Sequence, residues 1–468
     1  MLKYLNKTIG IDMTQNKKHS IDMVNGPLLK NIFIFAIPLM FANFFQMLFN
    51  AVDTIVVGKF AGEIPLAAVG ATGSICFFMT ALFNGLGTGS NVVIATLLGK
   101  GDTDNVKKAV HTSITMAIIS GLLLATLGLF CSHQILEMMQ TPSDIIDLST
   151  LYMRIYFMGA VFMLVYNFGA AILRSKGDTK RPLYFLMIGG VVNVVLNLIF
   201  VICFDMDVDG VAIATVISQA ISAILVTITL IKEEDATRLI VKELGIDTSI
   251  ASSIIRIGIP AGLQGVVFSF SNVVIQSYFN SFNDSLIVAG NAAGINIENF
   301  VYIGMFAFQQ ATITFTSQNI GANNYKLVKR IMYTCLMLTV VCGFGISYTI
   351  WSNGYFFLSL YTDEIAVMDV GMVRLTYVVL PLVLNGILDI FVCSMRGMGY
   401  STLPTSMVLL GICGTRFLWL WKIFPLYPTV ETIYACFPIS WVITCVIEFI
   451  FWMYCYKSTM NKHKSLAF

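Results

Sequence analysis

The sequence predicts an all-α polytopic membrane protein with 12 transmembrane helices in two six-helix lobes. The first observation is composition: 57% of the 468 residues are hydrophobic and only 12% are charged, against about 25% charged residues in an average soluble domain. The second is length, because apolar runs of about 20 residues, enough to cross a bilayer, recur from residue 31 to residue 457. The third is a repeat that divides the chain into two similar halves.

The apolar runs can be followed in order along the chain, separated by short polar loops. In the first half they cover residues 31–57, 65–98, 107–131, 145–173, 181–204 and 209–231. In the second half they cover residues 253–281, 286–320, 328–352, 366–395, 402–424 and 431–456. We therefore expect an N-terminal tail at 1–25, an N-terminal lobe at 26–232, a linker at 233–250, a C-terminal lobe at 251–457 and a C-terminal tail at 458–468.

The direction of the crossings follows from the Lys and Arg residues. Most of the 28 basic residues lie in the two tails, in the linker and in every second loop. The other loops are mainly acidic, as in the stretch that contains Asp205, Asp207 and Asp209. Because cytoplasmic loops carry an excess of Lys and Arg, both termini are expected in the cytoplasm. The division of the basic residues among short loops argues against nucleic-acid binding.

Cysteine spacing and loop motifs exclude other classes of protein. The ten cysteines form no C-x-x-C pair, and most lie inside apolar runs, where cysteine behaves as a small hydrophobic residue. The loops contain no phosphate-binding P-loop and no Ser/His/Asp or metal-ligand pattern. We therefore expect neither an enzyme nor a protein with a bound cofactor.

The internal repeat has a constant offset of 222 residues. The stretch "LLGKGDTDNVKKAV" contains Gly99, and its counterpart "QNIGANNYKLVKRIM" contains Gly321. The same offset relates Pro38 to Pro260, each in the first helix of its half. It also relates the following pairs: Asn50 and Asn272, Arg174 and Arg396, Gly177 and Gly399, Pro182 and Pro404, and Ser218 and Ser440.

A repeat of six crossings gives both halves the same orientation, so a pseudo-twofold axis is expected along the membrane normal. Transporters built in this way bind their substrate between the halves and rock one half against the other. A duplicated channel or scaffold is the alternative, although the sequence has no ion-filter or pore signature. The repeat therefore favours a carrier.

Four stretches carry a resemblance to a known family. They are "IPLMFANFFQMLFNAVDTIVVGKFAGEIPLAAVG" at 37–70, "YNFGAAILRSKGDTKRPL" at 166–183, "IGIPAGLQGVVFSFSNVVIQ" at 257–276 and "SMRGMGYSTLP" at 394–404. They resemble the multidrug and toxic compound extrusion (MATE) family of bacteria, over residues 26–456 or nearly the whole chain.

The resemblance implies an antiporter in the bacterial inner (plasma) membrane. Such proteins export amphiphilic, often cationic, solutes in exchange for Na⁺ or H⁺, and the coupling ion is the only ion implied. The wider superfamily also contains flippases of lipid-linked cell-envelope precursors, which is the alternative function. The expected partners are small organic solutes and the bilayer, and the fold is expected to be complete as a monomer.

A polar group of residues in the first lobe is the candidate cation site. An ionisable residue inside a membrane suggests a function by default, and Asp53 lies in the first apolar run. Asn193 and Asn197 lie one helical turn apart, and Thr215 is expected at a similar depth. A carboxylate with amide and hydroxyl oxygens suits Na⁺, or a proton on Asp53. The alternatives are an interfacial Asp53 and amides that only join helices.

In the resemblance, these four positions match a proposed cation site of the N-terminal lobe. The family often has Asp where this chain has Asn197, so only one carboxylate remains and Na⁺ is slightly favoured. At the 222-residue offset Asp53 becomes Ile275 and Thr215 becomes Phe437. The second lobe thus lacks the four candidate cation ligands, and it has Arg416 beside the counterpart of Asn193. Ion coupling is therefore assigned to the first lobe.

Other polar residues in apolar runs are candidates for substrate binding. Asp389, its repeat partner Asn167, and Glu298 are the candidates, each with a structural hydrogen-bonding or pairing role as the alternative. Arg374 and Glu448 are expected to be paired or to extend toward the interface. Pro38 and Pro260 are candidate hinges, because proline removes a backbone hydrogen bond; a fixed kink is the alternative.

Overall fold

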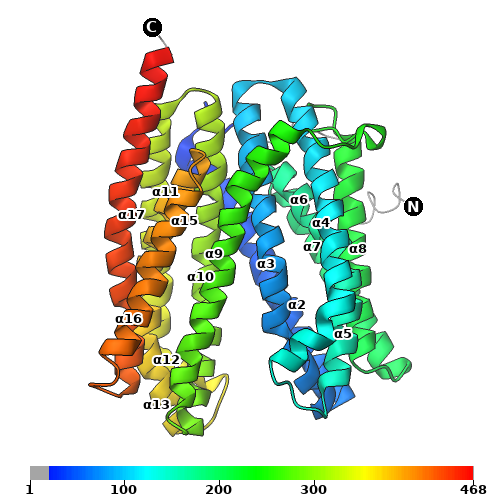
Figure 1. The fold of residues 1–468 in the computed structure, drawn as a ribbon, viewed down its shortest axis with the longest axis vertical. Helices are drawn as coiled ribbons and strands as arrows, with labels where there is room; N and C mark the ends of the chain where they lie inside the picture. Colours follow the sequence, from blue (N-terminus) through cyan, green and yellow to red (C-terminus); the bar gives the residue numbers. More distant parts are fainter. Residues whose placement is uncertain (1–20, 467–468) are drawn as a thin grey trace. The chain divides into compact units, whose positions relative to one another are not determined.

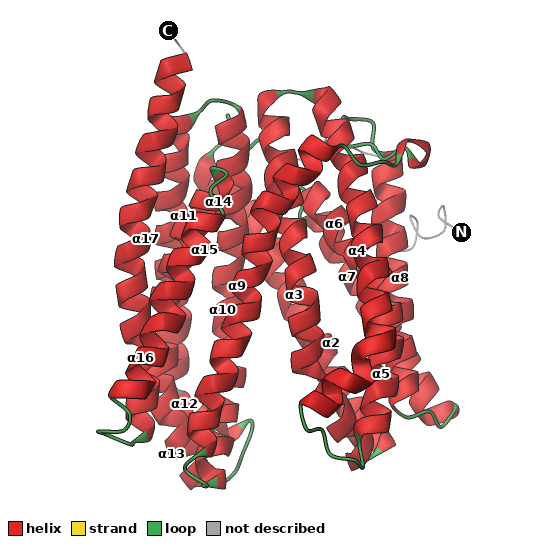
Figure 2. Cartoon of the chain, viewed as in Figure 1, coloured by secondary structure: helices red, strands yellow, loops and turns green. Residues whose placement is uncertain are grey.

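The computed structural model describes residues 21–466, and within them it contains helices and no strand (Figures 1 and 2). The side chains are described as far as residue 461. Most of the predicted N-terminal tail, residues 1–20, and the last two residues of the predicted C-terminal tail lie outside this part of the chain. The rest of the C-terminal tail continues the last helix, which ends at Leu466.

Seven α-helices and two π-helical segments form the first half of the described chain. They are α2 (Leu28–Val56), η2 (Val57–Ala61), α3 (Glu63–Lys100), α4 (Thr103–Met138), α5 (Ile146–Met158), α6 (Ala160–Ser175), α7 (Lys180–Leu198), η3 (Ile199–Cys203) and α8 (Val208–Lys232). A short segment, η4 (Val241–Glu243), lies in the predicted linker, and α9 begins at Thr248.

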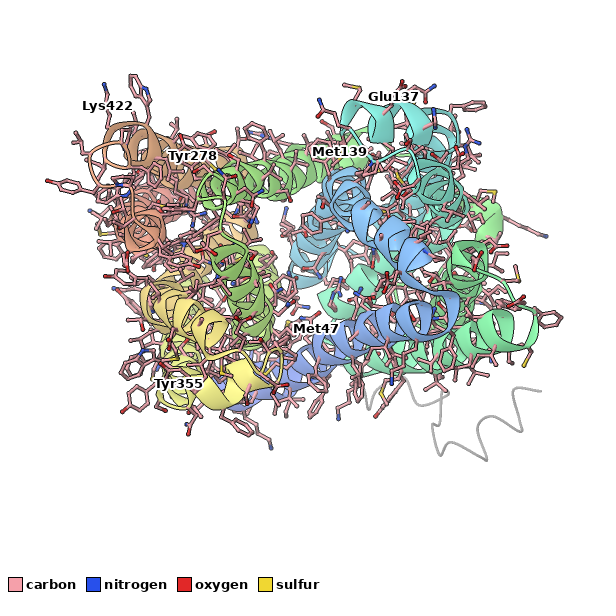
Figure 3. All side chains as sticks on the ribbon, turned by 90° about the horizontal axis from the view of Figure 1, so that it is seen from below. Met47, Glu137, Met139, Tyr278, Tyr355 and Lys422 are labelled. Atoms are coloured by element: carbon pink, nitrogen blue, oxygen red, sulfur yellow. The ribbon has the colours of Figure 1, made fainter. Side chains whose placement is uncertain are left out.

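The second half repeats this order. It contains α9 (Thr248–Asn280), α10 (Ser285–Gly321), α11 (Tyr325–Ser352), α12 (Gly354–Ser359), α13 (Ile365–Arg374), η5 (Leu375–Val379), η6 (Leu380–Leu382), α14 (Val383–Gly397), α15 (Thr402–Val408), η7 (Leu409–Gly414), α16 (Thr415–Lys422) and α17 (Val430–Leu466). Figure 3 looks onto one end of these helices, where Tyr278, Tyr355 and Lys422 lie.

Eleven helical stretches among the described residues are long and apolar enough to cross a membrane, and 12 if the bent pair α5–α6 counts as one span. The 12 predicted spans and the all-α fold class are therefore confirmed. The bend of 46° falls at Gly159. A Cβ atom there would lie 2.7 Å from Val216 of α8, so glycine allows the close approach of the two helices.

The repeated basic loop between the second and third spans has a local explanation. Gly101 ends α3 with a φ of +72°, a left-handed conformation that glycine adopts without strain. The Asp102 side chain then accepts a hydrogen bond of 3.2 Å from the backbone N–H of Asn105 and caps α4. In the second copy, Asn323 takes the left-handed position with a φ of +58°.

The contacts divide the chain into two compact units. Unit 1 contains residues 41–259, and unit 2 contains residues 27–40 and everything from Pro260 onward. The division cuts α2 after Met40 and α9 before Pro260, so each of these long helices contributes to both units. From the sequence we expected each lobe to be one continuous stretch, with the first ending at residue 232 and the second beginning at residue 251. These limits stay a prediction.

A buried cluster of charges joins two loops of unit 1. Lys176, after α6, pairs with Glu233, after α8, at 2.5 Å and with Asp235 at 3.0 Å. Arg181 pairs with the same Glu233 at 2.6 Å and also with Asp178. Glu233 therefore sits between two cations, and it connects the loop that starts α7 to the segment that follows α8.

We expect Glu233→Gln to lower the stability of unit 1 strongly. The substitution keeps the shape of the side chain but leaves two buried cations short of one carboxylate, a loss that costs about 3–5 kcal/mol. Thermal unfolding of the purified protein in detergent measures the effect. Glu234→Gln, at an exposed neighbouring position, is the matched control, and an equal melting temperature for both variants would contradict the expectation.

Candidate functional site

The four residues predicted to bind a cation come together in unit 1. Asn197 Nδ2 donates a hydrogen bond of 2.5 Å to Asp53 Oδ1 and lies 3.4 Å from Asn193 Oδ1. Asn193 Nδ2 in turn donates to Thr215 Oγ1 at 3.3 Å. The side chains thus form one continuous series of hydrogen bonds from α2 through α7 to α8. We call these four residues the Asp53 cluster.

The local sequence of α7 explains why the cluster can form. Asn193 and Asn197 are one helical turn apart, so they lie on the same face. Gly190, almost one turn earlier, packs against the ring of Phe49 on α2, where a Cβ atom would overlap the ring. Gly189 lies equally close to Ser222 on α8. The two glycines let α7 approach α2 and α8 closely enough for short polar side chains to meet.

The cluster leaves one buried oxygen without a partner. Asn193 and Asn197 are buried, at 4% and 0% exposure. Asn197 Oδ1 accepts no hydrogen bond, although its amide nitrogen is bonded to Asp53. Thr215 donates its own proton to the carbonyl of Val211 at 3.0 Å. An unsatisfied amide oxygen beside a carboxylate is an arrangement that a bound cation would complete.

The chemistry of the cluster favours a hard monovalent cation over a transition metal. Its ligand atoms are oxygens from one carboxylate, two amides and one hydroxyl, and hard cations such as Na⁺ prefer oxygen. Across residues 21–466, no group of three or more His, Cys, Asp or Glu side chains is arranged to hold a metal ion.

Asp389, a predicted substrate residue, is held by neutral donors. Its Oδ2 atom accepts hydrogen bonds from Gln309 Nε2 at 3.0 Å, Tyr302 Oη at 3.2 Å and Asn385 Nδ2 at 3.4 Å. Oδ1 accepts no hydrogen bond from the described part of the chain. Tyr302 and Gln309 were not predicted from the sequence, although their spacing of two helical turns places them on the same face of α10.

The other two predicted substrate residues lie in different settings. Glu298 pairs with Arg374 at 2.5 Å in unit 2, so the expectation that Arg374 is paired is confirmed. Asn167, in unit 1, donates to Asn84 at 2.9 Å. Glu448 differs from its expectation as a paired or interfacial residue: it is fully buried, and neither carboxyl oxygen has a hydrogen-bond partner in the described structure. It faces the interior because α17 packs along α14.

The two candidate hinge residues lie inside continuous helices. Pro38 is in α2 and Pro260 is in α9, and both helices continue beyond their proline. The division into units cuts α2 two residues after Pro38 and cuts α9 directly before Pro260. Each proline therefore lies where its helix passes from one unit to the other.

A helical membrane fold that contains two copies of one repeat, with a polar cluster around an ionisable residue in the first copy, is typical of a membrane transporter. The model of the MatE family matches residues 38–199 and again residues 260–420. The chain belongs to the MatE family, and it is a membrane transporter and not an enzyme. The two matched stretches begin at Pro38 and Pro260, the residues that the repeat relates to each other.

Curated relatives agree with this assignment. Over 343 residues the chain is 28% identical to "Probable multidrug resistance protein YpnP" of Bacillus subtilis, covering 73% of this chain and 76% of that protein. It is 25% identical to "Probable multidrug resistance protein YoeA" of the same organism, covering 83% and 85%. It is 22% identical to "Multidrug export protein MepA" of Staphylococcus aureus, covering 82% and 85%.

Solved structures share the fold at lower identity. A MOP superfamily transporter from Pyrococcus furiosus superposes with a TM-score of 0.88 at 20% identity, covering 94% of this chain and 98% of the other. A multidrug resistance MATE family transporter in an outward-facing conformation also gives 0.88 at 20% identity, covering 94% and 99%.

Proposed function

We propose that the protein is a secondary-active antiporter that exports amphiphilic, mainly cationic, drugs or metabolites in exchange for Na⁺ or H⁺. The observation that carries this proposal is the Asp53 cluster, a set of oxygen ligands with two buried amides, one carboxylate and one unsatisfied amide oxygen. The names of the curated relatives, multidrug resistance and multidrug export proteins, support the class of substrate. They do not favour the alternative, a flippase of lipid-linked precursors.

The composition of the cluster supports Na⁺ as the coupling ion. Asp53 supplies one negative charge, which a monovalent cation neutralises. Asn193, Asn197 and Thr215 supply neutral oxygens of the kind that replace the water around a hard cation. Asp53 alone could also carry a proton, so the test applies a gradient of each ion separately.

In the transport cycle that we propose, cation binding at Asp53 and solute binding at Asp389 bias the two units toward different arrangements. The units rock against each other, and α2 and α9 bend at Pro38 and Pro260. The protein acts as a monomer in the bacterial inner membrane, with both termini in the cytoplasm, as the positions of Lys and Arg favour.

Purified protein in liposomes tests the proposal. We expect a fluorescent organic cation to move against an imposed Na⁺ gradient, and the rate to fall to that of empty liposomes when the gradient is collapsed by an ionophore. A proton gradient of equal size is applied separately to identify the ion. Movement that ignores both gradients would contradict antiport, and movement of lipid-linked precursors alone would favour the flippase.

A further inference from the structure

Unit 2 contains a group of charged side chains, one of which, Arg416, lies near the counterpart of the Asp53 cluster in the second repeat. Arg374 of α13, Arg416 of α16 and Glu298 of α10 gather around the ring of Phe437 on α17. We call them the arginine cluster. At the 222-residue offset, Phe437 corresponds to Thr215, and the residue before Arg416 corresponds to Asn193. Arg416 therefore lies one residue beyond the counterpart of Asn193, and Phe437, against which it packs, is the counterpart of Thr215.

Both terminal nitrogens of Arg374 have an acceptor, whereas its buried Nε atom has no hydrogen-bond partner among the described residues. Its Nη2 atom pairs with Glu298 Oε2 at 2.5 Å, and its Nη1 atom donates to Asn291 Oδ1 at 2.6 Å. Its guanidinium carbon lies 5.6 Å from the centre of the Phe437 ring. A Cβ atom on Gly294 would lie 2.5 Å from Arg374 Cδ, so this glycine makes room for the side chain. Arg374 and Glu298 thus neutralise each other in a fixed geometry.

Arg416 has no such partner. It is 6% exposed, and its Nε atom donates one hydrogen bond, of 3.2 Å, to Ser440 Oγ. Among the described residues it forms no ion pair, and no acceptor is bonded to its two terminal nitrogens. With two arginines and one carboxylate, the arginine cluster carries one excess positive charge. A buried charge of this kind is costly unless an opposite charge completes it.

Two aromatic rings lie near the guanidinium of Arg416. The guanidinium carbon lies 4.3 Å from the centre of the Phe437 ring and 6.0 Å from that of Trp441. Aromatic rings engage the flat face of a guanidinium, whereas carboxylates and other acceptors bind along its edge. The rings therefore hold the side chain in place without using the N–H groups that an anion needs.

We propose that Arg416 binds a single monovalent anion, which is either a carboxylate group of a transported solute or a halide ion. Anion binding at Arg416 does not require that the protein transports anything, whereas binding of a solute carboxylate rests on the proposed export function. Combined with the Asp53 cluster, it gives the protein one cation site in the first repeat and one anion site in the second.

Binding of radiolabelled chloride to the full-length protein in nanodiscs tests the proposal without any ion gradient, so a failure of the export assay cannot be confused with a failure of the site. We expect saturable chloride binding by the wild type and at least a tenfold weaker affinity in Arg416→Gln, as for the loss of a charge-assisted interaction. Arg154→Gln removes an exposed arginine of unit 1 and should bind as the wild type does.

Two further measurements make the result specific. Glu298→Gln removes the competing carboxylate, so it should bind chloride several-fold more tightly, a gain that a purely structural cluster would not give. It also tests the site if Arg416→Gln does not fold. Benzoate that displaces chloride identifies carboxylates as ligands, whereas binding of chloride alone identifies a halide site. The proposal would be overturned if the wild type bound neither chloride nor benzoate, or if the wild type and Arg416→Gln bound chloride with equal affinity.

Discussion

Asp53→Asn is expected to reduce ion-driven transport to the rate of empty liposomes. Asparagine has nearly the same shape as aspartate, and its oxygen can still accept the hydrogen bond that Asn197 donates at 2.5 Å. The substitution therefore removes the negative charge of the cluster and little else. Loss of a charged partner costs about 1.5–3 kcal/mol, which is a factor of about 10–150 in the affinity for the cation.

The measurement compares uptake of a fluorescent organic cation by wild type and variant under the same Na⁺ or H⁺ gradient. Asp207→Asn, the same exchange at an exposed position just before α8, is the matched control and should transport normally. Direct binding of labelled Na⁺ separates a coupling defect from a folding defect. A variant that transports as fast as the wild type and stays dependent on the gradient would remove Asp53 from the coupling mechanism.

The spans were predictable from the sequence because a bilayer demands a long apolar stretch for each helix. The limits of the helices were less predictable. α17 continues to Leu466, beyond the end of its apolar run at residue 456, because helix formation does not stop where hydropathy falls. The break between α5 and α6 was also missed, because it depends on the contact between Gly159 and Val216 of another helix.

The Asp53 cluster was predictable as a set because depth along a helix follows from residue number. The spacing of Asn193 and Asn197 and their distance from the helix end placed them near Asp53 before any contact was known. Its hydrogen bonds were not predictable, since they depend on how closely Gly190 lets α7 approach Phe49. The arginine cluster shows the same limit: Arg416 stood out in the sequence, but the Phe437 ring beneath it is a tertiary contact.

Asp389→Asn is expected to weaken the binding of cationic solutes while leaving ion binding at Asp53 unchanged. The three donors to Asp389 all bond to Oδ2, with distances of 3.0–3.4 Å. Because one oxygen is held and Oδ1 accepts no hydrogen bond from the described residues, the carboxylate is oriented but retains an oxygen for a ligand. An asparagine oxygen can replace Oδ2, so the substitution removes the charge and preserves the support.

We expect the KM for a permanently charged organic cation to rise at least about tenfold, as for a lost charge-assisted contact, and the KM for a neutral analogue of the same shape to stay within a factor of two. Asp369→Asn, at an exposed position in α13, is the control. The comparison of two solutes separates a binding role from a structural one. If Asp389 only holds α10 against α14, its substitution should lower the transport of both solutes equally, whatever their charge. Equal changes for the two solutes would therefore assign Asp389 to the packing of unit 2, whereas a change confined to the charged one assigns it to the solute.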